Sequence, residues 1–424
     1  MFIPEIIDHI ENGFADGRFA ALYGADRIGE QRKRYTDAVR AFEALYGDGD
    51  CRILSVSGRS EISGNHTDHN RGCVLAASVD VDIIAVVKKT DGGVIRVKSK
   101  GFDEDVCPLR GVPDKKSVRY SSKAIIYGVC DGFEKRGYET GGFSAYTTST
   151  VLKGSGLSSS AAFEDMIGYI LSVLYNGDSV SDVEIAKISQ YAENEFFGKP
   201  CGLMDQVACA VGGFVYIDFG GDEPEITPVP FDLTAAGYDL CIVNTGGNHA
   251  DLNEDYASVP AEMKSVAALF GKEVLRGLTE ADIISRLPEI REKLGDRAAL
   301  RAIHFVREND RVVKQKDALL RGDADTFLSL AKGSGDSSYK YLQNVYTTKN
   351  PSEQGLSLAL CVTEGLLSGR KAAYRVHGGG FAGTVQAFVP RGFTQTYKTE
   401  TEKIFGKGSC SVLHVRAEGT ADII

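Results

Sequence analysis

The residues that most suggest chemistry lie in the stretch "LKGSGLSSSAAFEDMIGYIL" (152–171), where glycines and serines precede an apolar helical pattern. Glycine lets backbone N–H groups turn towards a ligand without a Cβ in the way. The first turn of a helix also carries unpaired N–H groups and a partial positive charge. A glycine loop that runs into a helix N-terminus is therefore a potential binding site for phosphate.

A plain structural explanation of this stretch is a serine-capped helix that follows a tight turn. The helix is expected over 158–175, and its apolar residues recur at steps of three and four. The expected buried face consists of Phe163, Met166, Ile167, Ile170 and Leu174. The stretch lacks the pattern GxxxxGK[ST], which excludes a Walker-type phosphate loop.

Two further stretches carry side chains that could take part in catalysis or binding. Asp205, in "GLMDQ" (202–206), could accept a proton from an attacking hydroxyl group, or it could equally be the N-cap of a helix. The spacing alone leaves both possibilities open. His66 and His69, in "NHTDHN" (65–70), could suggest a metal site, but no third ligand is near and the run is typical of a loop.

The periodicity of the rest of the chain predicts a mixture of helices and strands. These alternate irregularly, which favours an α+β fold over a doubly wound sheet. The expected helices are 28–46, 120–136, 158–175, 181–197, most of 260–332, and 353–367. The expected strands are 52–58, a hairpin over 72–99 that turns at Asp-Gly-Gly, 142–150, 212–219, 238–243, 372–377 and 384–389.

The length of 424 residues exceeds what one hydrophobic core usually serves. We therefore expect two domains, 1–225 and 226–424, with the boundary in the acidic Gly/Pro patch "GGDEPEITPVP" (220–230).

The composition argues against several classes of partner. The net charge is −10 and no Lys/Arg-rich run offsets it, which disfavours nucleic acid. No apolar run reaches the ~18 residues that a membrane span needs. The N-terminus "MFIPEIIDHIENG" lacks the basic start of a signal peptide. Nine cysteines without a CxxC pair are typical of reduced thiols, so we expect a cytoplasmic protein.

Four stretches together resemble a known family of small-molecule kinases. "LKGSGLSSSAA" resembles the phosphate loop P-x-G-x-G-L-S-S-S-A of the GHMP kinases. "GRSEISGNHTDHNRGCVLAASVD" (58–80) resembles the galactokinase signature G-R-V-N-L-I-G-E-H-T-D-Y-N-x-G-x-V-L-P. "GKPCGLMDQ" (198–206) is similar to G-x-P-C-G-I-M-D-Q, and "RVHGGGFAG" (375–383) to R-M-T-G-G-G-F-G-G. They occur in family order, and the resemblance spans residues 58–389.

The resemblance implies a two-domain GHMP kinase fold. Its N-terminal domain would be like domain 2 of ribosomal protein S5, its C-terminal domain would be ferredoxin-like, and the active site would lie between them. It implies a galactokinase that uses ATP and Mg²⁺ to convert α-D-galactose to α-D-galactose 1-phosphate. We expect a monomer with a small-molecule sugar and ATP as its partners.

The resemblance also assigns roles to individual residues. Arg59 and Asp205 match the catalytic residues, and Ser158 and Glu193 match the Mg²⁺ ligands. Glu193 is chosen over Glu195, its neighbour in "AENE", because of its distance from the "PCG" segment. ATP and its phosphates would contact Gly154, Ser155, Gly156, Leu157, Ser158, Ser159, Ser160 and Ala161. His377 stands where the family usually has threonine, and we expect no catalytic role for it.

The expected sugar ligands are Asn65, His66, Asp68, Gly202 and Tyr256, the last matched by its step of seven residues from His249. Asn65 replaces a family glutamate that accepts a hydrogen bond from the sugar's 6-hydroxyl group. An amide can accept the same bond, but it can also donate and it carries no charge. Galacturonate and N-acetylgalactosamine are therefore alternative substrates. A non-catalytic sensor of galactose and ATP is a further alternative.

Overall fold

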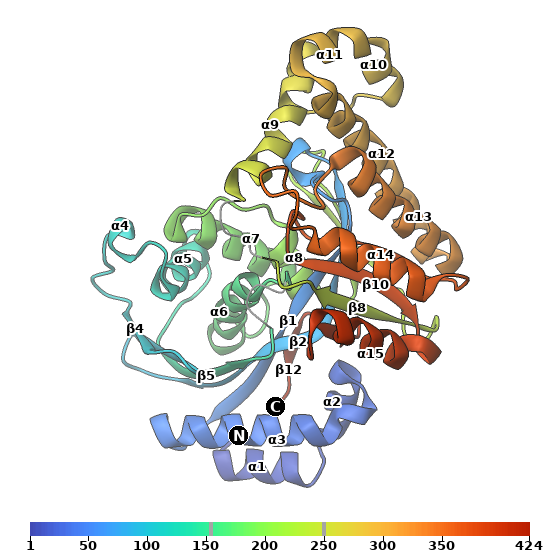
Figure 1. Ribbon diagram of the computed structural model, residues 1–424. Coiled ribbons are helices and arrows are strands. Elements are labelled where there is room, and N and C mark those ends of the chain that lie inside the picture. Colours follow the sequence, from blue (N-terminus) through green and yellow to red (C-terminus); the bar gives the residue numbers. More distant parts are fainter. Residues whose placement is uncertain (152–155, 248–251) are drawn as a thin grey trace.

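The computed structural model describes residues 1–151, 156–247 and 252–424, which form two β-sheets and the helices around them (Figure 1). Among these residues the larger sheet has eight strands in the order β12-β1-β2-β5-β3-β4, with β6 paired to β2 and β7 paired to β6. Its strands are β1 (Cys51–Ser63), β2 (Cys73–Lys89), β3 (Val94–Ser99), β4 (Glu104–Pro108), β5 (Phe143–Ser149), β6 (Phe214–Asp218), β7 (Glu225–Val229) and β12 (Thr420–Asp422).

The smaller sheet has the order β11-β8-β10-β9, and all its pairings are antiparallel. Its strands are β8 (Tyr238–Asn244), β9 (Ala373–His377), β10 (Thr384–Pro390) and β11 (Cys410–Leu413). The helices α14 (Gly355–Leu367) and α15 (Thr394–Phe405) pack beside this sheet (Figure 1). The remaining helices of this half are α9 (Asn253–Leu269), α10 (Glu280–Ser285), α11 (Leu287–Leu294), α12 (Asp296–Leu320) and α13 (Ala324–Ser337).

The central strands of the larger sheet are buried on both faces, because helices cover each side. Successive side chains of a strand point to opposite faces, so Ile53 packs with the N-terminal helices while Leu54 packs with the helices on the other side. The first group is α1 (Ile3–Glu11), α2 (Asp16–Tyr23) and α3 (Ile28–Tyr46), and both chain ends lie beside it (Figure 1). The second is α5 (Ser122–Lys135), α6 (Ser159–Tyr175), α7 (Asp182–Ala192) and α8 (Met204–Val211), with the short α4 (Lys115–Val118) nearby.

Most predicted elements are confirmed to within a few residues. The helix predicted over 28–46 is α3, and the strand predicted over 142–150 is β5. The helix predicted over 181–197 is α-helical only as far as Ala192 and continues as a π-helical turn, η3 (Glu193–Phe197). Such turns are frequent at functional sites.

The hairpin predicted over 72–99 is wrong. The two strands exist as β2 and β3, but β5 lies between them, antiparallel to β2 and parallel to β3. The Asp-Gly-Gly signal marks a real turn, yet a local turn does not decide which strands pair. Phe143 and Ala145 of β5 are fully buried in that position, and the packing of a distant strand overrides the local pattern.

The buried face predicted for the helix over 158–175 is only partly right. Met166, Ile167 and Ile170 are fully buried, whereas Phe163 and Leu174 are half-buried. Unexpectedly, the acidic Glu164 and Asp165 on the other side of α6 are buried too. The reason is that α6 packs against α5, α7, α8 and the sheet, which leaves its middle without a solvent face.

The chain returns to the larger sheet after building the smaller one. β12 pairs with β1, and β7, which begins at Glu225, extends the sheet through β6. The division at 225/226 stays a prediction, and a C-terminal strand crosses back over it. No helix in the described part of the chain combines the length and apolarity of a membrane span. All nine cysteines are free thiols, and only Cys201 and Cys361 are not buried.

Candidate active site

An arginine–aspartate pair stands where strand β1 meets the starts of helices α6 and α8. Arg59, on β1, donates from Nε to Asp205 Oδ1 at 2.8 Å and from Nη2 to Oδ2 at 2.6 Å. Ser158, directly before α6, donates from Oγ to Asp205 Oδ2 at 2.6 Å. Arg59 also donates from Nη1 to the carbonyl oxygen of Gly156. The structure therefore brings both predicted catalytic residues together at the phosphate loop.

This pair is charged yet accessible. Burial alone would raise the pKa of Asp205, but the Arg59 guanidinium and the hydrogen bonds from Arg59 and Ser158 hold the pKa below its usual value. The Asp205 side chain is 31% exposed and that of Arg59 is 11% exposed. A fixed carboxylate and a fixed guanidinium thus face a space that a substrate can enter.

The phosphate loop is described from Gly156 onward, and Gly154 and Ser155 lie outside the described residues. Gly156 has φ +74° and Ser158 has φ +58°, so the chain makes a left-handed approach to α6. Ser158 occupies the N-cap position, but its hydroxyl makes no cap and turns to Asp205 instead. Ser160, in the first turn, is exposed. The serine-cap explanation is therefore wrong for Ser158, and the helix N-terminus faces outward.

Leu157 and Ala161 do not share that exposure, since both are buried in the core beneath the loop. Ser159 is half-buried and begins α6. The side chains of Leu157 and Ala161 are buried, so these two residues could contact a ligand only through their backbone. The hydroxyl groups of Ser159 and Ser160, in contrast, have access to solvent.

Two buried carboxylates lie next to the pair and share one amide. Gln206 Nε2 donates to Glu164 Oε2 at 3.0 Å and to Glu193 Oε2 at 3.0 Å, and Lys199 Nζ lies 3.3 Å from Glu193 Oε1. Burial and the charge of Glu193 raise the pKa of Glu164 to about 8. One carboxyl of this cluster therefore keeps its proton near neutral pH, as expected for close carboxylates.

The structure separates the two glutamates of "AENE". Glu193 is buried beside Gln206, the residue that follows Asp205, and it opens the π-helical turn η3. Glu195 is exposed and lines an outer cavity. Of the two, only Glu193 is bonded to Gln206, the residue next to Asp205, and its role towards a metal stays a prediction.

Three of the predicted sugar ligands gather on the glycine turn 378–380 that follows β9. Its three successive carbonyl oxygens accept hydrogen bonds from Asn65 Nδ2 at 2.7 Å, His66 Nε2 at 2.9 Å and Tyr256 Oη at 2.9 Å. Glycine is required in this turn, because a Cβ on Gly379 would lie 2.7 Å from the Tyr256 ring. His249, from which Tyr256 was matched, lies outside the described residues.

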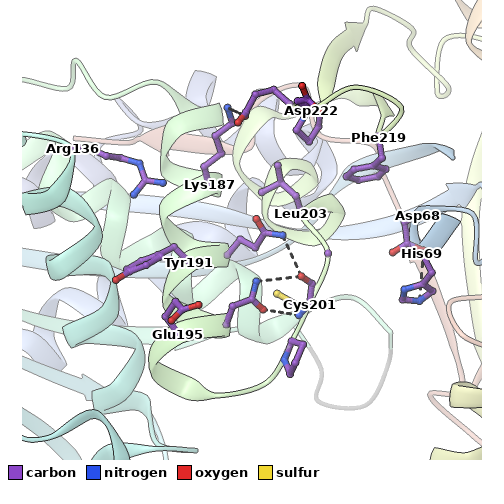
Figure 2. A pocket seen from close by; sticks show the side chains of 16 residues that line it. Asp68, His69, Arg136, Lys187, Tyr191, Glu195, Cys201, Leu203, Phe219 and Asp222 are labelled. Atoms are coloured by element: carbon purple, nitrogen blue, oxygen red, sulfur yellow. Dashed lines mark hydrogen bonds and ion pairs between the residues drawn. The ribbon is translucent and has the colours of Figure 1, made fainter. Parts of the chain in front are cut away.

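The other two predicted sugar ligands, Asp68 and Gly202, both line a cavity of about 720 Å³, in which Figure 2 shows Asp68 next to His69. A Cβ on Gly202 would lie 3.2 Å from Asp68 Oδ2, so glycine leaves room for the carboxylate. The chain between Gly202 and α7 is held by Asn194, whose Oδ1 accepts from the Cys201 N–H at 2.7 Å. Asp68 keeps 23% of its side chain exposed and can accept hydroxyl hydrogen bonds there.

The phosphate loop and the glycine turn meet at His377. A Cβ on Gly156 would lie 3.2 Å from the His377 ring. His377 is buried and bonds Ser60 Oγ at 3.1 Å and Thr384 Oγ1 at 2.9 Å. Burial and two nearby arginines lower its pKa to about 3, so the ring is neutral. It fills the space between the two motifs, and the expectation that it has no catalytic role stays a prediction.

Sequence reasoning missed Gln206, Lys199, Glu164 and Glu61. Gln206 and Lys199 lie inside the quoted motif "GKPCGLMDQ", so the motif carried a signal for them. Glu164 comes four residues after Ser160, outside the face of the helix that was expected to be buried. No residue pattern marks it, because its burial depends on α7 and α8.

A buried histidine on α12 gives a test of the electrostatics. His304 Nε2 lies 3.0 Å from the Asn65 carbonyl oxygen, which can only accept, and Nδ1 lies 2.9 Å from Ser337 Oγ. Burial lowers the pKa of His304 to about 4. The unfolded chain, with a histidine pKa of about 6.5, binds this proton first. The free energy of unfolding is therefore expected to fall as the pH drops from about 6.5 to 4.

The comparison that isolates this effect uses His304→Gln, which keeps an N–H donor for Asn65 but cannot titrate. We expect the melting temperature of the natural protein to fall more steeply than that of the variant between pH 7 and pH 4.5. A constant difference across this range would contradict the neutral buried histidine.

Comparisons with known proteins identify the family of this chain. The description "GHMP kinases N terminal domain" matches residues 124–213, and "Galactokinase galactose-binding signature" matches residues 40–89. The chain is 31% identical over 353 residues to a galactokinase of Streptomyces coelicolor. The alignment covers 82% of this chain and 87% of that protein. A galactokinase of Actinobacillus pleuropneumoniae serotype 3 is 32% identical over 363 residues, 83% of this chain and 89% of that protein.

Solved structures show the same fold. A Lactococcus lactis galactokinase complexed with galactose superposes with a TM-score of 0.73 at 22% identity, covering 90% of this chain and 98% of that one. A Methanococcus jannaschii mevalonate kinase gives 0.59 at 16% identity, covering 88% and 99%. The fold and the phosphate loop thus define a two-domain kinase of the GHMP class. Within that class, the chain belongs to the galactokinase family.

Proposed function

We propose that the protein transfers the γ-phosphoryl group of ATP to the anomeric hydroxyl group of galactose. The observation that carries this proposal is the bidentate Arg59–Asp205 pair, which stands at the outward-facing N-terminus of α6 and also receives the Ser158 hydroxyl. An acceptor hydroxyl held at Asp205 would lie beside the place where a helix N-terminus favours phosphate. The family of the relatives supports the sugar assignment.

In this mechanism Asp205 orients the attacking hydroxyl group. Its lowered pKa keeps the carboxylate ionised, so it accepts the hydroxyl's hydrogen bond and directs the oxygen at the phosphoryl group. Arg59 fixes the carboxylate and places positive charge where the transferring group gains negative charge. Phosphoryl transfer depends mainly on such positioning and charge stabilisation.

The proposed sugar site combines His66, Asp68, Gly202 and Tyr256, which come from both sides of the 225/226 division. We propose that the active site lies between the two domains, 1–225 and 226–424. The nine free thiols fit a reducing compartment, and we propose a cytoplasmic location.

We also propose that Ser158 and Glu193 would hold Mg²⁺. No group of three or more His, Cys, Asp or Glu side chains is placed to hold a metal among the residues described. Mg²⁺ does not need such a group, because it usually takes one or two protein carboxylates together with substrate phosphates and water. A bound Mg²⁺ would neutralise phosphate charge, while Lys199 and Gln206 fix the Glu193 carboxylate.

A metal-binding measurement tests this assignment. We expect Glu193→Gln to weaken Mn²⁺ binding in the presence of ATP by about tenfold or more, because it removes a charged ligand and keeps the side chain's shape. Electron paramagnetic resonance of Mn²⁺ reads this without turnover. Glu195→Gln is the matched control, two residues away and exposed, and it should leave binding unchanged. Equal affinities for both variants would reject Glu193 as a ligand.

The function itself is tested by ADP release from Mg-ATP with galactose, galacturonate, N-acetylgalactosamine, glucose and arabinose. We expect galactose to give the highest kcat/KM, with galactose 1-phosphate as the product. A higher value for another sugar would make that sugar the substrate. Galactose binding without turnover would indicate a sensor.

A further inference from the structure

Asn65 is the expected sugar ligand that departs from the family signature, and the structure leaves it no free donor. Its Nδ2 donates to Glu61 Oε1 at 3.0 Å and to the Gly378 carbonyl at 2.7 Å. Its Oδ1 accepts from Asn344 Nδ2 at 2.7 Å. The residue is only 1% exposed. Both N–H bonds of the amide are therefore used inside the protein.

Glu61 is the second half of this arrangement. Its Oε1 accepts from Asn65 and also from Arg375 Nη2 at 3.0 Å. Arg375, on β9, is fully buried and donates from Nη1 to the Ile62 carbonyl at 2.8 Å. A buried guanidinium requires a charged partner, and Glu61 is the carboxylate that supplies it. The amide of Asn65 then satisfies the same carboxylate from the other side.

The galactokinase signature carries these two residue types the other way round. The signature has asparagine at the position of Glu61 and glutamate at the position of Asn65. In this chain the carboxylate and the amide, which stand four residues apart, have therefore changed places. In this chain a carboxylate at 65 would stand against Glu61 in a buried space, which costs free energy by like-charge repulsion. An amide at 61 would remove the carboxylate that pairs with Arg375 at 3.0 Å and leave only the more distant charge of Glu308. Each of these two substitutions alone is unfavourable. Made together, they again give one carboxylate and one amide at positions 61 and 65.

We propose that Asn65 is a positioning residue that, as one half of an exchanged pair with Glu61, holds the sugar-binding loop against the glycine turn and does not bind the sugar. Its side chain bonds Gly378, and its backbone carbonyl accepts from His304 Nε2 at 3.0 Å. The next residue, His66, bonds Gly379. Asn65 thus fixes the loop that presents His66 and Asp68.

What this proposal implies for sugar specificity rests on the proposed function. A positioning residue acts on every sugar equally, so the side chain at 65 sets no preference at C6. Discrimination would come from His66, Asp68 and Tyr256 instead.

The first experiment is a thermal unfolding cycle of Glu61→Asn, Asn65→Glu and the double variant, without any substrate. We expect each single variant to lower the melting temperature by about 4 °C or more, because each leaves a buried charge unmatched. The double variant should recover at least half of the summed loss. Glu292→Asn, at an exposed position of α11, is the control for the substitution itself. Additive losses would overturn the pairing, whether or not the protein phosphorylates galactose.

The second experiment separates positioning from ligation. It compares kcat/KM for galactose and for 6-deoxygalactose in the natural protein, in Asn65→Ala and in the double variant. Asn65→Ala is expected to lower both kcat/KM values together. The ratio of kcat/KM for galactose to kcat/KM for 6-deoxygalactose should stay within twofold of that of the natural protein. If Asn65 binds the 6-hydroxyl group, the ratio should fall by about tenfold instead. Calorimetric sugar affinities give the same comparison if the protein binds without turnover.

Discussion

Replacement of Asp205 by asparagine is expected to lower kcat by about 10²- to 10⁴-fold. Asparagine keeps the shape of the side chain but lacks the negative charge. Arg59 now binds that charge through two hydrogen bonds of 2.8 and 2.6 Å. It also presents an N–H group where the attacking hydroxyl needs an acceptor. Because Asp205 carries its charge through the reaction, the loss falls on kcat more than on the KM for ATP. Initial rates of ADP release at saturating substrate measure it.

The control for this prediction is Asp222→Asn. Asp222 is an exposed aspartate that lines the cavity of Figure 2, a cavity whose lining includes neither Arg59 nor Asp205. Its variant should keep the natural rate, and both variants should retain the melting temperature within a few degrees. A kcat for Asp205→Asn within tenfold of the natural value would show that the carboxylate does not orient the acceptor.

The resemblance predicted that Arg59 and Asp205 are catalytic, but the sequence did not show that the two side chains form an ion pair. Arg59 and Asp205 are 146 residues apart, and only the resemblance of two separate motifs named them. That Ser158 turns its hydroxyl to Asp205 depends on a left-handed backbone at the start of α6. Such a conformation is uncommon for serine and has no residue signature.

Asn65 shows a different limit. The motif placed it correctly in the loop, but its partners Asn344 and Gly378 come from 279 and 313 residues further along the chain. No local pattern reports whether a side chain points into a ligand site or into the interior. The fold shows the same contrast: the periodicity of α3 was sufficient to place it, whereas the pairing of β2 depended on β5, which follows after two intervening helices.

A second large effect is expected at Asp82, which joins both ends of the chain to the larger sheet. Asp82, on β2, is fully buried and pairs with Arg34 Nη1 at 2.6 Å and Arg416 Nη1 at 3.4 Å, and it accepts from the Tyr23 hydroxyl. Burial alone would raise its pKa, but the two guanidinium groups hold the pKa below the usual value. Asp82→Asn leaves two buried or nearly buried cations without their anion. We expect a loss of about 3–5 kcal/mol in the free energy of unfolding.

Denaturant titration at pH 7 measures this loss, and Asp37→Asn, on the exposed side of α3, provides the control. The pH dependence gives an independent check. Because the folded pKa of Asp82 lies below that of the unfolded chain, the charge contributes stability above about pH 4 and loses it as the pH falls through the folded pKa. The gap between the natural protein and Asp82→Asn should therefore stay constant from pH 7 to 5 and narrow below pH 4. A gap that persists unchanged in acid would mean that the negative charge of Asp82 is not what holds the chain ends to β2.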